Sequence, residues 1–294
     1  MRRHLFDVHR IVQVAVTGPR RRSCIMSYLI LQRSRPMKIA TWNVNSLKVR
    51  QQHVIDWLEL SQTDVLCLQE LKLPNEKFPR AELEARGYKS WFAGQKTYNG
   101  VGIIVRDGIA VDEASIVRNI PGFEDEQQRV ICATVEGVRV ISAYFPNGQA
   151  PGTDKFAYKL RWLNALHDWI AGEMTRHSKL ALLGDYNIAP EDRDVHDPKA
   201  WEGQNLVSPE ERAQFERLVA LGLVDAFRLF DQPEKSFTWW DYRMLAFRRN
   251  AGLRIDHVLL SKELALNCTL CDVDKTPRKW EQPSDHAPVF AQIG

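Results

Sequence analysis

Five short apolar stretches of the 294-residue sequence end in side chains that could bind a metal ion or move a proton. These side chains are Asn43, Glu70, Asp185 with Asn187, Asp256, and Asp285 with His286. A single acid at such a place carries little information, because strands commonly end in turn-forming residues. Five ends that carry acids, amides and a histidine are harder to explain by turns alone. If the strands end side by side, these groups converge in one opening.

The residue types at these ends define a narrow chemistry. Oxygen ligands without cysteine suit a hard cation such as Mg²⁺ or Mn²⁺ better than zinc. Proteins usually bind Mg²⁺ through one or two carboxylates, while water and substrate phosphate complete the coordination. A histidine beside an aspartate can be held in one tautomer and one charge state. The combination indicates metal-assisted hydrolysis of a phosphate ester.

The same residues lie in motifs that follow one another in a recognisable order. The motifs are Thr41-Trp42-Asn43-Val44-Asn45, Leu68-Gln69-Glu70-Leu71-Lys72, Tyr144-Phe145-Pro146-Asn147-Gly148, Gly184-Asp185-Tyr186-Asn187-Ile188-Ala189-Pro190, Phe237-Thr238-Trp239-Trp240-Asp241-Tyr242-Arg243, Gly252-Leu253-Arg254-Ile255-Asp256 and Pro283-Ser284-Asp285-His286-Ala287-Pro288. Over about residues 37–292 the set resembles the exonuclease III family of DNA-repair nucleases, within the endonuclease/exonuclease/phosphatase superfamily. The resemblance implies a four-layer α/β sandwich, in which two mixed sheets are flanked by helices.

The resemblance also implies which side chains act. The metal ligands around Mg²⁺, with Mn²⁺ as a substitute, would be Asn43, Glu70, Asp185, Asn187, Asp285 and His286. The catalytic groups would be Tyr144, Asp185, Asn187, Asp256 and His286. Asp185 would activate water or protonate the leaving oxygen, and Asn187 would orient it. His286, held by Asp256, would donate to the scissile phosphate.

The expected substrate is double-stranded DNA with abasic sites or 3′ ends. Phosphate contacts would come from Lys72, Arg129, Arg243 and Arg254, and Trp239 with Trp240 would line a pocket for an everted sugar. Without the resemblance, tandem tryptophans read as core residues. In one departure from well-known members, which carry a histidine before the Gly-Val strand, this chain has Asn99, which can donate to phosphate but carries no charge.

Two other functions share parts of this pattern. A small-molecule phosphoesterase of the same superfamily, such as a phosphoinositide phosphatase, would share the metal and the Asp/His core. A non-catalytic DNA-binding relative would have lost some of the acting residues, and none is lost. The resemblance further implies a cytoplasmic monomer of bacterial type that hydrolyses phosphodiesters 5′ to abasic sites and removes nucleotides or blocking groups from 3′ ends.

The elements that must position these residues follow from hydrophobic patterning. Apolar runs predict strands at 37–43, 64–69, 88–92, 101–106, 129–135, 138–145, 179–184, 236–240, 253–260, 268–273 and 287–293. Helical spacing predicts helices at 47–60, 79–86, 154–175 and 208–221. Glu136-Gly137 predicts a hairpin turn. Many strands with few helices argue for two mixed sheets packed face to face rather than one doubly wound parallel sheet.

Composition divides the chain into two parts. Residues 1–36 contain eight arginines and one acid and carry a charge of +7, so the remaining residues carry −4. We expect 1–36 to be a disordered extension or the product of a mis-chosen start codon, although a transit peptide has a similar composition. Residues 37–294 are predicted to form one nuclease domain. Five irregularly spaced cysteines indicate a reducing compartment, and no run reaches the roughly 20 apolar residues of a membrane span.

Overall fold

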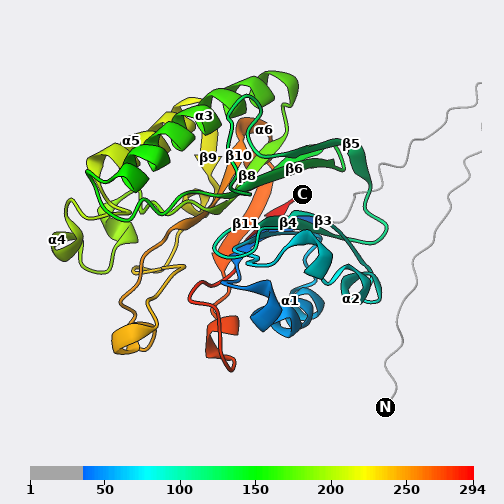
Figure 1. Ribbon diagram of the computed structural model, residues 1–294, viewed down its shortest axis with the longest axis horizontal. Coiled ribbons are helices and arrows are strands. Elements are labelled where there is room, and N and C mark those ends of the chain that lie inside the picture. Colours follow the sequence, from blue (N-terminus) through cyan, green and yellow to red (C-terminus); the bar gives the residue numbers. More distant parts are fainter. Residues whose placement is uncertain (1–35) are drawn as a thin grey trace, which may run out of the picture. The chain divides into compact units, whose positions relative to one another are not determined.

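The computed structural model of the chain describes residues 36–294. The predicted extension, except for Pro36, lies outside the described residues. By their contacts, the described residues form one unit. Within it, two six-stranded sheets pack against each other and helices cover their outer faces (Figure 1). The four-layer α/β sandwich expected from the sequence is therefore confirmed.

The two sheets have the same arrangement of directions. The first sheet has the order β11 (Cys268–Val273), β12 (Val289–Ile293), β1 (Met37–Asn43), β2 (Val65–Gln69), β4 (Val101–Arg106) and β3 (Tyr88–Ala93). The second has the order β5 (Val111–Arg118), β6 (Val130–Val135), β7 (Val138–Tyr144), β8 (Leu180–Asp185), β10 (Asp256–Ser261) and β9 (Leu223–Asp225). Among these paired strands, β1 with β2 and β7 with β8 are parallel, and the other pairs are antiparallel.

The helices form the two outer layers. Helices α1 (Leu47–Ser61) and α2 (Arg80–Glu84) lie on the first sheet, and α3 (Asp154–Arg176) and α5 (Pro209–Ala220) lie on the second (Figure 1). The short helices are α4 (Pro198–Trp201) and α6 (Lys262–Ala265), with 3₁₀ turns η1 (Asn75–Lys77), η2 (Asp192–Asp194), η3 (Ala226–Leu229), η4 (Arg243–Leu245) and η5 (Pro277–Lys279).

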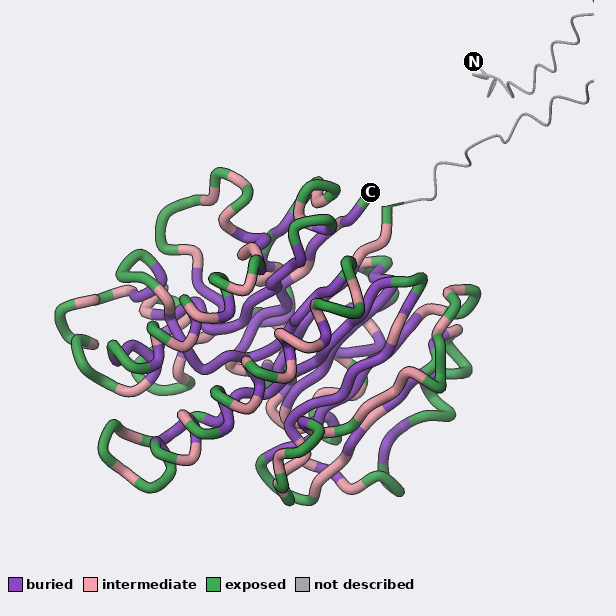
Figure 2. The backbone as a smooth tube through the Cα atoms, turned by 90° about the horizontal axis from the view of Figure 1, so that it is seen from above, coloured by how far each residue is buried: buried purple, intermediate pink, exposed green. Residues whose placement is uncertain are grey.

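Alternation along the strands separates three apolar layers. Ile39 of β1 and Leu183 of β8 belong to the core between the sheets. Trp42 of β1 packs under α1, and Leu182 of β8 packs under α3 and α5. Central strands are therefore buried on both faces, as the continuous purple segments of Figure 2 show. A strand residue whose side chain points to the inner face of its sheet therefore lies between the two sheets.

The predicted strands agree with the structure except in three places, and the short helices α4 and α6 were not predicted. The predicted strand 236–240 is wrong, because Trp239 forms only isolated bridges, to Leu253 and His286. Strands β5 and β9 were missed, since β5 is a largely exposed edge strand with little apolar patterning and β9 has three residues. The predicted hairpin turn is confirmed, with positive φ at Glu136 and Gly137 as a type I′ turn requires.

The starts of two helices show different ways to satisfy backbone N–H groups. Ser208 and Glu211 form a reciprocal capping box at the start of α5. At the start of α1, the side chain of Ser46 forms no capping hydrogen bond. Instead, the N–H groups of Ser46 and Leu47 donate to the carbonyls of Glu70 (2.8 Å) and Leu71 (3.0 Å). The start of α1 is thus joined to the turn that follows β2.

Gly184 allows β8 to approach β7 closely. A Cβ atom at this position would lie 1.8 Å from the carbonyl oxygen of Ala143 on β7. A side chain of any size would therefore displace one backbone from the other. Tyr144 and Asp185 are the last residues of these two strands, directly after Ala143 and Gly184. The close approach of the strands therefore also sets the distance between Tyr144 and Asp185.

We predict that Gly184→Ala lowers the free energy of unfolding by about 1–3 kcal/mol or more, since the methyl group meets backbone rather than a movable side chain. Thermal unfolding followed by circular dichroism measures the change. Gly172→Ala in α3, where the nearest atom is 3.8 Å away, is the matched control and should stabilise by up to about 1 kcal/mol. Equal stability of Gly184→Ala and the wild type would contradict the prediction.

Candidate active site

Strand directions bring the predicted residues to one edge of the sandwich. In the first sheet, parallel β1 and β2 end together at Asn43 and Gln69, which Glu70 follows. In the second sheet, Asp185 is the direct partner of Tyr144 on β7 and of Asp256 on β10. The alternation that places Ile39 and Leu183 in the core between the sheets also turns these residues inward.

Asn43 connects the two sheets at this edge. Its Nδ2 donates to Oε1 of Glu70 (2.8 Å) and to Oδ2 of Asp185 (2.9 Å). The hydroxyl of Tyr144 donates to the same oxygen of Glu70 (2.9 Å). Burial, followed by the charges of Glu70 and Asp185, raises the pKa of Tyr144 well above its usual value, so the hydroxyl remains a donor. Residues separated by more than 100 positions thus share one hydrogen-bond network.

The turn that carries Glu70 has an unusual backbone. Glu70 and Lys72 both adopt a positive φ, 53° and 52°. Such conformations cost energy for residues with a Cβ and persist where surrounding contacts impose them. Here the contacts are the bonds from the start of α1, together with a bond from the N–H of Lys72 to Asn99 (2.9 Å). The ammonium of Lys72 lies 2.7 Å from Oε2 of Glu70.

Asp185 is buried and held by Asn187. The N–H of Asn187 donates to Oδ1 of Asp185 (2.9 Å), while its side-chain Nδ2 donates to the carbonyl of Phe145 (3.1 Å). Asn187 adopts a φ of 50°, which turns the chain back toward Asp185. Burial raises the pKa of Asp185 to about 7; the charge of His286 opposes this shift, and that of Asp256 adds to it. The carboxyl can therefore exchange a proton near neutral pH.

His286 forms an ion pair with Asp256. Its Nδ1 lies 2.9 Å from Oδ2 of Asp256, and its Nε2 lies 3.8 Å from Oδ2 of Asp185. Burial alone would lower the pKa of His286, but the carboxylates of Asp256 and Asp185 outweigh it and raise the pKa to about 10. The ring is thus cationic at neutral pH and presents an Nε2–H group to the opening between the sheets.

Two of the predicted ligands, Glu70 and Asp185, could hold a metal ion together beside the cationic His286. One atom of each of these three side chains lies within 4.8 Å of the others. Two carboxylates and no thiolate fit a hard cation. Asp285 is not part of this group, because its oxygens accept from Asn45 (2.9 Å) and from Nε1 of Trp239 (3.0 Å). Burial opposes ionisation of Asp285, but the nearby His286 and these donors keep its pKa below the usual value.

Arg254 does not lie on the surface, so the prediction that it contacts DNA phosphates is wrong. Its side chain is 1% exposed and pairs with Asp194 (Nε–Oδ1, 2.6 Å) and Asp225 (NH1–Oδ2, 2.8 Å). A buried guanidinium requires such partners, because an unpaired one would be strongly destabilising. The same guanidinium lies 3.1 Å from Nδ1 of His257, whose pKa burial lowers to about 4. Arg254 stabilises the interior behind Asp256.

The tandem tryptophans lie in different environments. Trp240 is fully buried, and its Nε1 donates to Oδ1 of Asn250 (3.1 Å), so the prediction that it lines a DNA pocket is wrong. Trp239 is only partly buried and faces Asp285. Neighbouring residues of an extended segment point to opposite sides, so one ring reaches the site and the other enters the core.

A polar pocket of about 660 Å³ opens beside Tyr144. Arg129 lines it and is held by Gln127 (Nε–Oε1, 3.0 Å) and by the carbonyl of Tyr144 (3.2 Å from NH1). Asn99 also lines this pocket, and its Nδ2 donates to Oε1 of Gln95 (3.0 Å). The pocket therefore presents a fixed guanidinium next to the catalytic candidates.

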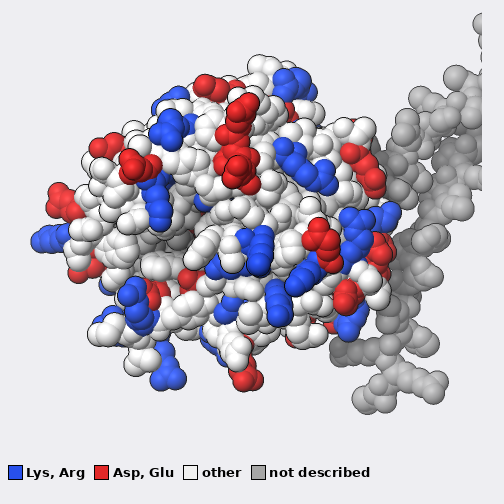
Figure 3. All heavy atoms as spheres, viewed as in Figure 1, with Lys and Arg blue, Asp and Glu red and all other residues white. Residues whose placement is uncertain are grey.

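Charge on the surface is mixed rather than of one sign. Figure 3 shows lysine and arginine side chains interspersed with acids over the face that it presents. Arg243, a predicted phosphate contact, is exposed and pairs with Asp241 (NH2–Oδ2, 2.6 Å). A polyanion would therefore be attracted by local cations near the opening, as the net charge of −4 for residues 37–294 requires.

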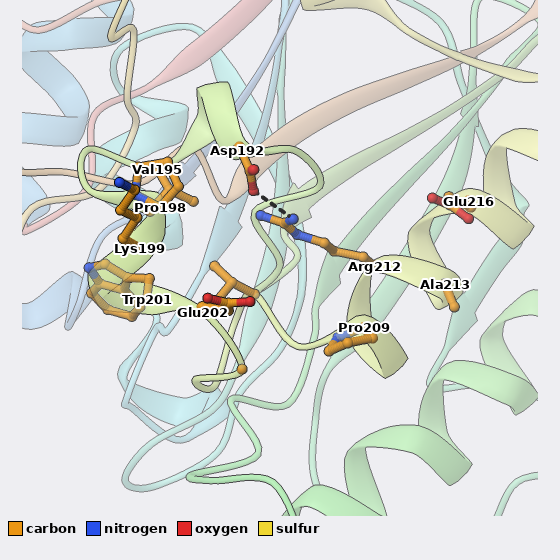
Figure 4. A pocket seen from close by; sticks show the side chains of 12 residues that line it. Asp192, Val195, Pro198, Lys199, Trp201, Glu202, Pro209, Arg212, Ala213 and Glu216 are labelled. Carbon is orange, nitrogen blue, oxygen red and sulfur yellow. Dashed lines mark hydrogen bonds and ion pairs between the residues drawn. The ribbon is translucent and has the colours of Figure 1, made fainter.

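A second pocket, of about 510 Å³, lies between α4 and α5 (Figure 4). Trp201, Glu202 and Arg212 line it, and Arg212 pairs with Asp192 (2.8 Å). None of the predicted site residues lines this pocket. We therefore assign the chemistry to the edge at which Asn43, Glu70 and Asp185 meet.

The sequence did not identify several residues that complete the site. Asn45 accepts from Lys72 (2.6 Å) and donates to Asp285, and the hydroxyl of Tyr242 donates to the carbonyl of Pro283 (2.9 Å). Both lie in the quoted motifs, so a signal existed. Lys159, fully buried under Asn187, had no such signal, because a lysine in a helix usually lies at the surface.

Comparisons with known proteins agree with this geometry. The model of the endonuclease/exonuclease/phosphatase family matches residues 40–286. The exodeoxyribonuclease III of Haemophilus influenzae is 36% identical over 273 residues, which cover 87% of this chain and all of that protein. Among the described residues, no helix is long and apolar enough to cross a bilayer.

Solved structures show the same fold. A 3′ phosphatase from Neisseria, solved with a product DNA hairpin, is 46% identical with a TM-score of 0.85, covering 88% of this chain and 99% of that one. An AP endonuclease from Archaeoglobus fulgidus is 35% identical with a TM-score of 0.83, covering 87% and 99%. This chain therefore belongs to the endonuclease/exonuclease/phosphatase family and, within it, to the group that contains exodeoxyribonuclease III.

Proposed function

We propose that this chain is a metal-dependent DNA-repair nuclease. It removes nucleotides or blocking groups from 3′ ends of duplex DNA and hydrolyses the phosphodiester 5′ to abasic sites. The observation that carries the proposal is the meeting of Glu70, Asp185 and the cationic His286 within 4.8 Å at one opening. The similarity to an exodeoxyribonuclease III and a 3′ phosphatase supports the first activity, and the similarity to an AP endonuclease supports the second.

The proposed cofactor is Mg²⁺, with Mn²⁺ as a substitute. Glu70 and Asp185 supply carboxylate oxygens, and the described donor set contains no thiolate, which suits these ions. A divalent ion at this place supplies a Lewis acid for a phosphoryl oxygen and makes water more acidic. Asn43 holds the two carboxylates in position by donating to both. Asn187 and Asp285 act by orienting these groups rather than as members of the three-residue group.

His286 is proposed to stabilise the charge that develops on the scissile phosphate. Asp256 binds Nδ1 and leaves the Nε2–H group free to donate in a fixed direction. Donors that are already oriented toward developing charge commonly make the largest contribution to catalysis. Tyr144, kept protonated by its raised pKa, donates its one proton to Glu70 and so helps to hold that carboxylate at the same opening.

Asp185 is proposed to move the proton. Without a bound metal, burial raises the pKa of its carboxyl to about 7. Asn187 fixes its orientation, so the carboxyl is placed to take a proton from water or to give one to the leaving oxygen. Catalysis of this kind contributes about 10²–10⁴-fold. Phosphates along the strand are contacted by Lys72, Arg129 and Arg243, and the exposed edge of Trp239 contacts the sugar, so binding should weaken steeply with salt.

We further propose that the enzyme is a monomer in the cytoplasm. All the acting groups come from one chain. The four cysteines in the described part of the chain are free thiols, which fits a reducing compartment.

Incubation of the full chain with DNA tests the proposed function. We expect Mg²⁺ to support the release of nucleotides from a recessed 3′ end, the removal of a 3′ phosphate and the cleavage of a duplex with one abasic site, and a chelator to abolish all three. Product sizes and end groups are read on denaturing gels. Hydrolysis of small phosphate esters alone would favour the phosphoesterase alternative, and binding without cleavage would favour the non-catalytic one.

We predict that His286→Ala lowers kcat by about 10²–10³-fold, the usual effect of removing one charge-stabilising donor. His167→Ala is the control, since this residue pairs with Asp168 on α3 outside the site. Steady-state kinetics on the preferred substrate measure the loss, and circular dichroism checks folding. A folded His286→Ala protein with the wild-type kcat would refute the assigned role.

We predict that Mg²⁺ raises the unfolding temperature of the wild type and raises that of Glu70→Gln far less. A ligand present at 100 times its dissociation constant stabilises the folded state by about 2.7 kcal/mol. Glu202→Gln, in the pocket between α4 and α5, removes an acid outside the site and should keep the wild-type response. Identical responses of Glu70→Gln and the wild type would place the metal elsewhere.

A further inference from the structure

A fully buried ion pair lies beneath the candidate active site. Lys159 of α3 and Glu211 of α5 pair with each other, and neither side chain is accessible to solvent. The ammonium of Lys159 also donates to the carbonyls of Asn187 (2.7 Å) and Asn147 (3.2 Å). An ammonium has three donor protons, so these three acceptors use all of them.

The two carbonyls belong to the two turns that form one side of the site. Asn147 lies in the turn after β7, and Asn187 lies in the turn after β8. Nδ2 of Asn147 donates to Oδ1 of Asn187 (3.0 Å), and the N–H of Asn187 donates to Asp185 (2.9 Å). A continuous chain of contacts therefore runs from Lys159 to the carboxylate of Asp185.

The turn after β7 rests directly on the lysine. Gly148 adopts a φ of +87°, and a Cβ atom there would lie 2.9 Å from Cδ of Lys159. This contact gives a physical reason for the Asn147-Gly148 pair of the motif that follows Tyr144. The turn fits only with a glycine over the methylene groups of Lys159.

Glu211 is fixed as tightly as its partner. Its Oε2 accepts from the N–H (3.1 Å) and the hydroxyl (2.8 Å) of Ser208 in the capping box of α5. Replacing a buried ion pair by apolar residues of similar size is often neutral or stabilising. A contribution to stability alone therefore explains the presence of this ion pair poorly. The fixed position of the two backbone carbonyls that Lys159 binds is a more specific explanation.

We propose that Lys159 is a positioning residue, which holds the turns after β7 and β8 so that Asn187 orients Asp185 for catalysis, while Glu211 compensates its charge. The proposal rests on the proposed nuclease function. Lys159 acts through Asn147 and Asn187 and touches no substrate.

The double variant Lys159→Met/Glu211→Leu separates positioning from stability. Lys159→Met alone leaves a buried carboxylate and should lower the unfolding temperature, whereas the double variant removes both charges and should recover much of that loss. We expect kcat of the double variant to stay about 10- to 100-fold below that of the wild type, with little change in KM, as for other residues that orient catalytic groups. Recovery of kcat together with stability would overturn the proposal.

Arg139→Met is the matched control. Arg139 and Glu173 form a second buried pair (2.6 Å), each side chain 4% exposed, at the opposite ends of β7 and α3 from Tyr144 and Lys159. This variant should lose stability and keep the kcat of the wild type. Loss of kcat in Arg139→Met equal to that in the double variant would show a general effect of lost buried pairs and would also overturn the proposal.

Hydrogen exchange gives a readout that does not depend on activity. We expect backbone amides of residues 186–189 to exchange faster in the double variant than in Arg139→Met, and unchanged exchange there would refute the proposal even if no nuclease activity were found. An inactive wild type would instead refute the proposed function. If the double variant does not fold, Asn147→Ala interrupts the same chain of contacts at an exposed residue, and faster exchange at 186–189 is again expected.

Discussion

The site depends on holding three carboxylates close together at the opening between the sheets. Glu70, Asp185 and Asp256 meet there, and for Asp185 both burial and the charge of Asp256 raise the pKa. The amide of Asn43 donates to the first two, and the imidazolium of His286 lies between the last two. The pKa of about 7 for Asp185 shows that this compensation is incomplete. A divalent ion held by Glu70 and Asp185 would supply the missing positive charge.

The fold brings the carboxylates together through strand direction. In each sheet described here, the parallel pair lies near the centre, β1 with β2 and β7 with β8. Parallel strands end at the same edge, and hydrogen bonds from Asn43 to Asp185 and from Tyr144 to Glu70 join the two sheets there, so four strand ends open onto one space. Strand β10 runs antiparallel to β8, so its first residue, Asp256, lies at the same edge, opposite Asp185.

Residues at strand ends could be read from the sequence because polar groups interrupt apolar runs there. Asn43, Glu70, Asp185, Asp256 and His286 were found in this way and do lie together. The errors have a common cause. Arg254 and Trp240 were assigned to the surface. The side of the chain on which Trp240 lies could not be predicted, because residues 236–240 do not form the expected strand. The burial of Arg254 depends on Asp194, a partner far away in the sequence. Lys159 was missed for the same reason, since its partner Glu211 lies 52 positions away.

The bonds from Ser46 and Leu47 to the turn of Glu70 have a consequence for how an anion is held. Many phosphate-binding proteins use the free amides and the dipole at a helix start as a cradle. In this chain the amides at the start of α1 already donate to backbone carbonyls of the turn that carries Glu70. At this helix start, recognition of the DNA backbone must then come from lysine, arginine and imidazolium side chains, whose attraction weakens as the ionic strength rises. The affinity of the enzyme for its substrate should accordingly depend on the salt concentration.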